Sequence, residues 1–365
     1  MINSTQIKHA LEMYKSNLYK PNVEICVPGL VVGAVKDFVK SLDNLRLALQ
    51  QDTLIIHFST WNDNKVNMHT FTKLNSEAKE SYPNVIFNTS YINANSEFKD
   101  IVLRLLNKLN IKYDSPAEEL TSATLKKLIY LYTTYKVMNH ACSSYSHFNK
   151  GPEFPIDKIF LKLSTKTIIE MNQKDLKGSL RSIFRSILNT GSRHLSVEDY
   201  KEMHHPFDLI ISYITTTSGV GDIAYFISFN QANKLFGGSI ESFEESLFNL
   251  YTDYSSRVPF KPYNISSFNN LAQYNYAVPF EGSVILYDYI KTKGVRVPIV
   301  SSKDLLKIFS GVRSITSPKL VFTDNRFILP DDINEYNKNL QYDEYGDEYV
   351  VSISEIKSLL APTDI

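Results

Sequence analysis

The stretch TLIIHFSTWND, residues 53–63, ends an apolar run with side chains that suit a nucleotide. Ser59 and Thr60 offer hydroxyls, Asp63 offers a carboxylate, and Trp61, the only tryptophan of the chain, offers a flat indole face. A stacking surface for a base beside polar groups for a ribose is a common composition of small-molecule sites. The structural alternative is that Trp61 only closes the edge of the core.

A second loop, VPGLVVG, follows an earlier apolar run and contains Pro28, Gly29 and Gly33. Glycines let the backbone come close to a ligand, which suits a phosphate. The sequence has neither GxGxxG nor GxxxxGK[ST], which argues against a Rossmann dehydrogenase and a P-loop NTPase. We therefore expect nucleotide-sugar or nucleotide contacts from a set that spans both loops: Pro28, Gly29, Ser59, Thr60, Trp61 and Asp63.

The elements that position these loops form a βαβ unit. A β-branched run over 23–32 is broken by the Pro-Gly pair, and Phe38, Leu42, Leu45 and Leu49 then repeat at helical spacing before the strand at 53–59. Such a unit predicts two parallel strands with a right-handed crossover, and ligands of open α/β sheets lie beyond the carboxyl ends of the strands. Further strands are expected at 84–90, 158–165, 207–215 and 223–229, helices at 98–110, 124–141, 229–236 and 283–294, and a hairpin around residues 324–325.

Composition bounds the class of protein. The chain has 365 residues, a formal net charge of zero and two cysteines, Cys26 and Cys142, which suit a reducing compartment rather than a disulfide framework. No window approaches the roughly 20 apolar residues that span a bilayer. We expect a cytoplasmic protein (host cytoplasm if phage-encoded), with one domain over residues 1–320, a helical insert at about 96–150, and an acidic extension over 321–365.

Residues 291–319 form a basic segment, whereas the chain beyond residue 320 is acidic. One interpretation is a solvated basic face. The other is a polyanion contact, such as a diphosphate or a nucleic-acid backbone. The predicted polyanion-binding residues are Lys291, Lys293, Arg296, Lys303, Lys307 and Arg313.

Residues 23–63 resemble the N-terminal signature of the WavE-type glycosyltransferases, in which a strand and turn lead to a helix and then to a strand ending in Ser-Thr-Trp. Segments 159–170 and 221–236 resemble two later elements of that family. The resemblance implies an α/β chain with a GT-A-like fold, which moves a sugar from a nucleotide-sugar to an acceptor hydroxyl, with a UDP-sugar as the expected donor. The residues that match the N-terminal signature are Ser41, Leu42, Leu45, Arg46, Ile55, Ile56, Ser59, Thr60 and Trp61.

The sequence departs from that family at the expected metal site. Ser164 and Lys166 stand where the family has arginine and aspartate. An ammonium group cannot ligate Mg²⁺ but can neutralise a leaving diphosphate, so Lys162 or Lys166 is predicted to do so without a required cofactor. If the alignment is shifted by one or two residues, a divalent metal is held instead by Asp157, Glu170 or Asp222.

For the general base we expect Asp222, which follows the glycine-containing SGVG loop. Glu281 is the second candidate, although it also suits a helix cap. Asp63 is the third, although beside Trp61 it better suits ribose binding.

Two acceptors stay open. The family resemblance implies lipopolysaccharide or another surface glycan. The Asn-, Lys-, Tyr- and Ile-rich composition is similar to that of T-even-type phage proteins, some of which glycosylate hydroxymethylated cytosines in DNA. The alternative to an enzyme is a non-catalytic α/β module that binds a nucleotide or a polyanion.

Overall fold

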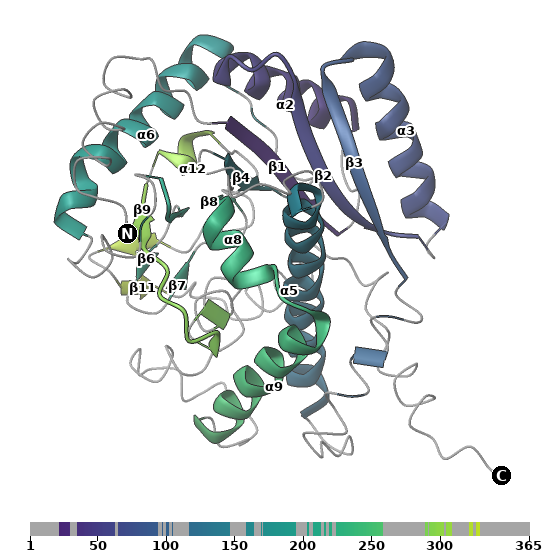
Figure 1. The fold of residues 1–365 in the computed structure, drawn as a ribbon, viewed down its shortest axis with the longest axis vertical. Helices are drawn as coiled ribbons and strands as arrows, with labels where there is room; N and C mark the ends of the chain where they lie inside the picture. Colours follow the sequence, from purple (N-terminus) through teal and green to yellow (C-terminus); the bar gives the residue numbers. More distant parts are fainter. Residues whose placement is uncertain are drawn as a thin grey trace.

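The fold is described from a computed structural model of the chain (Figure 1). The described residues are 22–29, 35–62, 65–93, 97, 100–101, 104, 117–146, 158–163, 169, 171–194, 203, 207–212, 215–216, 219–220, 224–257, 289–290, 292–302, 304–308, 321–323 and 326–328.

The predicted βαβ unit is confirmed. Strand β1 (Asn22–Pro28) leads to helix α2 (Val35–Leu49) and then to β2 (Leu54–Trp61), which pairs with β1 in parallel. The apolar face predicted for the helix is buried, with exposed fractions of 2% or less at Phe38, Leu42 and Leu45. Helix α3 (Lys65–Ser81), which was not predicted, leads to β3 (Val85–Ile92), a strand that pairs in parallel with β2.

The rest of the described chain departs from this alternation, because β5 to β8 are consecutive strands and α8 and α9 are consecutive helices. The hairpin predicted around residues 324–325 is confirmed by antiparallel pairing of its two strands, whose turn lies outside the described residues. The remaining elements are α5 (Ala117–Ser146), β4 (Lys158–Lys162), α6 (Gln173–His194), β5 (Ile210–Ser212), β6 (Thr215–Thr216), β7 (Gly219–Val220), β8 (Tyr225–Ser228), α8 (Phe229–Phe236), α9 (Ile240–Arg257), β9 (Ile299–Ser301), α12 (Leu305–Ile308), β10 (Val321–Thr323) and β11 (Arg326–Ile328).

Some predicted bounds need correction. The strand expected over 207–215 is shorter, because only residues 210–212 join the main sheet as β5 while Thr215 and Thr216 pair with β7 instead. The helix expected over 283–294 is described from residue 289 and ends, as predicted, at Gly294, whose φ is 63°. Most of the helix expected over 98–110 lies outside the described residues.

The main sheet has seven strands in the order β3-β2-β1-β4-β8-β5-β9. Strand β8 is antiparallel to both neighbours, β4 and β5, while every other neighbouring pair is parallel. The sheet is therefore mixed but mostly parallel, which confirms the predicted α/β class with a Rossmann-like sheet.

Alternation along the strands sends side chains to two different helical layers. Val23, Ile25 and Val27 of β1 join a core cluster with α2, α3, α6 and α12, whereas Cys26 joins a second cluster with α5, α8 and α9. We call the first side the α2 face and the second the α5 face. Helices α5 and α8 cross in front of the strands in Figure 1. Within the described chain, no helix has the length and apolar character needed to cross a bilayer.

Candidate functional site at the carboxyl edge of the sheet

Strand β1 lies at the point where the strand order reverses. From β1 the chain moves outward to β2 and β3, and β4 then pairs with the other side of β1. In open α/β sheets, ligands bind outside the carboxyl ends of the strands at such a switch point. The topology therefore directs attention to the ends of β1 and β4, which carry Pro28 and Lys162.

The two loops predicted to bind a nucleotide meet at this edge. Pro28 is in register with Ser59, and the N–H of Gly29 donates to the carbonyl of Ser59 at 2.8 Å. Gly29 has a φ of 86°, a conformation in which a Cβ is strained, so this turn needs glycine. Ser59 also shares a hydrogen bond between hydroxyls with Ser90 at the end of β3. The edge is thus a continuous line of hydrogen-bonded strand ends.

The polar side chains that are described at this edge are buried. Ser59, Thr60 and Lys162 each have an exposed fraction of 0%. Lys162 is in register with Cys26, whose side chain lies in the α5-face cluster. The ammonium group of Lys162 is therefore buried from solvent. The sequence prediction did not include this burial.

Other predicted site residues cannot be placed. The backbone of Trp61 pairs with Ile92, but its side chain lies outside the description. Among the described residues, no group of three or more His, Cys, Asp or Glu side chains could hold a metal ion. The predictions that fall outside the described residues are Asp63, Asp157, Ser164, Lys166, Glu170, Asp222, Glu281, Lys291, Lys303 and Arg313.

The described parts of the basic segment do not lie together. Lys293 lies at half-buried depth on the α5 face, where its Nζ donates to Ser242 Oγ of α9 at 3.2 Å. Arg296 is exposed. The backbone of Lys307 belongs to α12, whose Leu305 and Ile308 pack in the opposite core cluster. The polyanion contact stays a prediction, because Lys291, Lys303 and Arg313 lie outside the described residues.

A buried charged cluster on the α5 face was not predicted from the sequence. Glu24 of β1 accepts a hydrogen bond from Nε2 of His57 at 2.7 Å. Its other carboxylate oxygen accepts from the ammonium of Lys158 and the hydroxyl of Tyr145. Glu24, His57 and Lys158 have exposed fractions of 2%, 1% and 7%. A buried carboxylate needs such partners, because its charge is otherwise strongly destabilising.

The cluster continues through Asn88 to helix α5. Asn88 Nδ2 lies 3.2 Å from Nδ1 of His57, and Oδ1 of Asn88 lies 3.1 Å from Nε2 of His140. The network assigns the tautomers: His57 donates from Nε2 to Glu24 and accepts at Nδ1, while His140 donates from Nε2 to Asn88. A hydrogen-bonded chain therefore connects Glu24 to His140.

The pKa shifts agree with this pattern. Burial acts to raise the pKa of Glu24, but the hydrogen bond from His57, and then the charge and hydrogen bond of Lys158, outweigh it and hold the pKa below its usual value. Burial lowers the pKa of His140. Burial raises the pKa of the Cys142 thiol to about 12 and that of Cys26 well above its ordinary value, so neither is an activated nucleophile.

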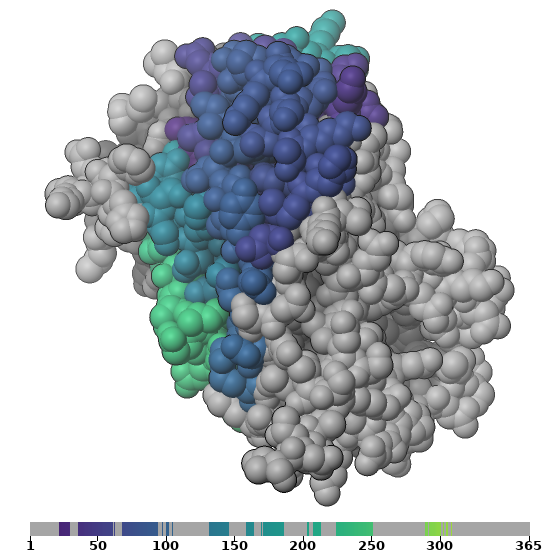
Figure 2. Space-filling model, turned by 90° about the vertical axis from the view of Figure 1, so that its right-hand side faces the viewer, coloured from purple at the N-terminus to yellow at the C-terminus, as the bar shows by residue number. Residues whose placement is uncertain are grey.

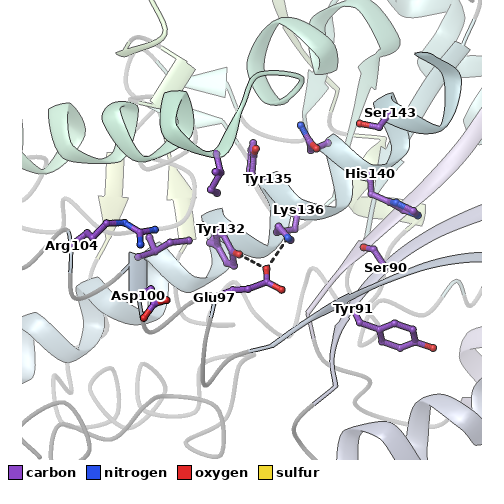
Figure 3. A pocket seen from close by; sticks show the side chains of 13 residues that line it. Ser90, Tyr91, Glu97, Asp100, Arg104, Tyr132, Tyr135, Lys136, His140 and Ser143 are labelled. Atoms are coloured by element: carbon purple, nitrogen blue, oxygen red, sulfur yellow. Dashed lines mark hydrogen bonds and ion pairs between the residues drawn. The ribbon is translucent and has the colours of Figure 1, made fainter. Parts of the chain in front are cut away.

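A cavity of about 450 Å³ opens where this chain of hydrogen bonds ends (Figure 3). This volume is within the roughly 300–1,000 Å³ typical of small-molecule sites. Ser90, at the carboxyl end of β3, lines the cavity, as do residues of α5 at positions 132, 135, 136, 139, 140 and 143 and residues of the 97–104 segment. Because Ser90 also contacts Ser59, the cavity adjoins the carboxyl edge of the sheet.

Ion pairs join the walls of this cavity. Nζ of Lys136 lies 2.8 Å from Oε2 of Glu97, which also accepts from the hydroxyl of Tyr132 at 3.1 Å. Arg104 pairs with Glu244 of α9 through Nε at 3.0 Å and through Nη2. Figure 2 shows the described residues of the 97–104 segment in blue next to α9 in green on this side of the molecule.

The sequence did carry a signal for the buried cluster. Glu24 and His57 each interrupt an apolar strand and Lys158 begins one, and an ionisable group in a buried strand needs a partner. The order of the strands determines which side chains pair with each other, and this order could not be predicted from the sequence.

Comparison with known proteins gives little further. No family model and no curated protein matches this chain. Among solved structures, the chain is similar to mouse xyloside xylosyltransferase 1 in its apo form, at 10% identity over 77% of this chain and 84% of that chain, with a TM-score of 0.32. At this TM-score the likeness supports no inference, and the resemblance to WavE-type glycosyltransferases stays a prediction.

Proposed function

We propose that this protein is a GT-A-like glycosyltransferase that binds a nucleotide-sugar, of which a UDP-sugar is our first choice, at the carboxyl ends of β1, β2 and β4. The reversal of strand order at β1, combined with the Gly29 turn against Ser59, is the observation that carries the proposal. Its support for the proposal is that a glycine turn lets the backbone come close to a phosphate, at the place where α/β sheets bind ligands.

In the proposed reaction, the bond between the anomeric carbon and the diphosphate breaks while a bond to the acceptor oxygen forms. The acceptor proton passes to a general base, for which Asp222 and then Glu281 are our candidates. The diphosphate gains charge as it leaves, and we assign its neutralisation to Lys166 or Lys162. A divalent metal held by Asp157, Glu170 or Asp222 is the alternative.

Burial of Ser59, Thr60 and Lys162 favours one other candidate function. If these groups stay closed to solvent, the chain is a non-catalytic α/β module that binds a nucleotide or polyanion at its surface loops.

The test is release of UDP from a panel of UDP-sugars, with and without EDTA, beside a thermal shift with the same ligands. We expect turnover that persists in EDTA. Turnover lost in EDTA would instead select the carboxylate metal site, whereas a thermal shift without turnover would select the binding module. No shift and no turnover with any UDP-sugar would overturn the proposal.

A matched pair of variants tests whether UDP-sugars bind at the carboxyl edge of the sheet. Ser59→Ala removes a buried hydroxyl at the proposed site, whereas Ser246→Ala removes a buried hydroxyl that bonds only its own helix, to Ser242 O at 2.8 Å. We expect the first variant alone to weaken the thermal shift by UDP-sugars.

A further inference from the structure

The cavity between β3, α5 and the described residues of 97–104 has charged walls, in which Lys136 pairs with Glu97 and Arg104 pairs with Glu244 of α9. Four of its lining side chains carry full charge: Glu97, Asp100, Arg104 and Lys136. Two are negative and two positive, and they come from both walls. Burial acts to raise the pKa of Glu97, but Lys136 outweighs it and lowers the pKa, so this carboxylate is ionised near neutral pH.

The histidine of the cavity adds no charge near neutral pH. His140 lies on α5 and donates from Nε2 to Asn88, which is itself bound to His57. Its lowered pKa keeps the ring neutral and leaves Nδ1 as an acceptor. Because Arg104 also pairs with Glu244 of α9, the cavity offers no excess of positive charge, and it contains both donors and acceptors.

The lining combines charged, amide and hydroxyl side chains with a larger apolar surface, as small-molecule sites generally do. Among the described residues, its aliphatic side chains are Ile101 and Ile240. Tyr132 and Tyr135 on the α5 wall are buried, whereas Tyr91 of β3 is 48% exposed and offers a ring face against which a sugar ring can stack. A polyanion would face Glu97 and Asp100 directly. A ligand with many neutral hydroxyls would meet an alternation of ammonium, guanidinium, carboxylate and amide groups.

We infer that this cavity binds a neutral saccharide. This inference rests on the proposed function, in which the saccharide is the acceptor of the transferred sugar. The acceptor is then a glycan rather than DNA. The place of the cavity agrees with this role, since Ser90 on its rim is hydrogen-bonded to Ser59 at the proposed donor site. Donor and acceptor would then meet across the ends of β2 and β3.

The test measures binding without any donor, by saturation-transfer NMR and calorimetry. The probes are lactose, maltose, cellobiose and dextran oligosaccharides, beside a sulfated oligosaccharide and short single- and double-stranded DNA. We expect binding of at least one neutral saccharide, weak dependence on salt, and no comparable binding of the anionic probes. Binding of DNA that fades steeply with salt, or no binding of any neutral saccharide, would overturn the inference.

Two matched pairs of variants locate the binding. Lys136→Met should weaken saccharide affinity about tenfold, the loss expected from one hydrogen bond to a charged group, while Lys36→Met on the exposed surface of α2 should not. Asp100→Ala should also weaken it, while Asp52→Ala, likewise at an exposed aspartate, should not. Equal effects within both pairs would contradict this location.

These outcomes are separate from those of the donor assay. Saccharide binding without turnover of UDP-sugars would leave this inference standing and remove the proposed function. Turnover of UDP-sugars without saccharide binding to the cavity would do the reverse.

Discussion

The two faces of one sheet differ in what holds them together. On the α2 face, the alternating residues of β1, β2 and β4 are aliphatic or aromatic and pack against α2, α3, α6 and α12. On the α5 face, the same strands carry Glu24, His57, Lys158 and Lys162, all nearly or fully buried. Apolar packing needs only volume and shape, whereas buried ions need each particular partner. The α5 face is therefore the face whose chemistry depends on exact strand order.

The largest expected effect breaks the buried ion pair of the α5 face. Lys158→Met leaves Glu24 with only His57 and Tyr145 as partners in a buried site. We expect the free energy of unfolding to fall by about 3–5 kcal/mol, the usual cost of removing one partner of a buried pair. Urea denaturation measures it.

A double variant shows whether charge causes that loss. Glu24→Gln combined with Lys158→Met removes both charges and should recover most of the lost stability, because well-packed neutral groups often replace buried pairs at little cost. A double variant that is as unstable as the two single losses added together would contradict this account.

On the α2 face we expect a loss of stability that cannot be recovered by removing the charge of a partner residue. Leu42→Ala, at a side chain with 1% exposure, should cost about 2–5 kcal/mol through lost burial and a residual cavity. Unlike the variants of the α5 face, its effect should be the same at pH 5 and pH 7 in urea denaturation. If the loss in unfolding free energy of Leu42→Ala depended strongly on pH, it would contradict the proposed difference between the two faces.

The pH dependence of stability should come partly from His140. Burial lowers its pKa in the folded chain below the ordinary value of about 6.5, so the unfolded chain binds the proton more readily. Stability from this group is complete above about pH 6.5 and is lost as the pH falls through the folded pKa. His140→Gln keeps an N–H near the position of Nε2 but does not titrate, so stability should fall less steeply with acid.

The control for that prediction is His69→Gln, at an exposed histidine of α3. Unfolding free energies of both variants would be measured between pH 7 and pH 5. A slope that changes equally in the two variants would show that the hydrogen-bonded chain to Asn88 has no part in the effect.

A smaller effect is expected where a hydroxyl caps a helix. Ser228 accepts from the N–H of Gln231 at the start of α8 and donates to Asp208 at 2.6 Å. Ser228→Ala should cost about 1 kcal/mol, within the roughly 0.5–2 kcal/mol of N-cap substitutions. Thermal unfolding measures it, and no change would mean that Asp208 alone holds the helix end.

Sequence patterns predicted the α2 face better than the α5 face. The spacing of Phe38, Leu42, Leu45 and Leu49 fixes a helix and its buried side, because amphipathic periodicity is a local property. Helix α3 was not predicted, since KVNMHTFTKLNSEAKES is mostly polar and buries few residues, among them Phe71, Leu74 and Ala78.

The site was predicted only in part, for a different physical reason. Pro28, Gly29, Ser59 and Thr60 follow neighbouring strands of one βαβ unit, so their proximity could be inferred locally. The contact of Glu24 with Lys158, and of His57 with Asn88, depends on the pairing of β1 with β4 and of β2 with β3. Pairing between distant segments is set by the whole fold, which no short pattern contains.

The central claim is that a nucleotide-sugar binds at the carboxyl ends of β1 and β2. Backbone hydrogen exchange, followed with and without UDP, UDP-glucose and UDP-galactose, tests it most directly. The account predicts slower exchange in peptides covering residues 28–35 and 59–65, with α9 unchanged. Slower exchange confined to other parts of the chain, or no change with any of the three, would contradict it.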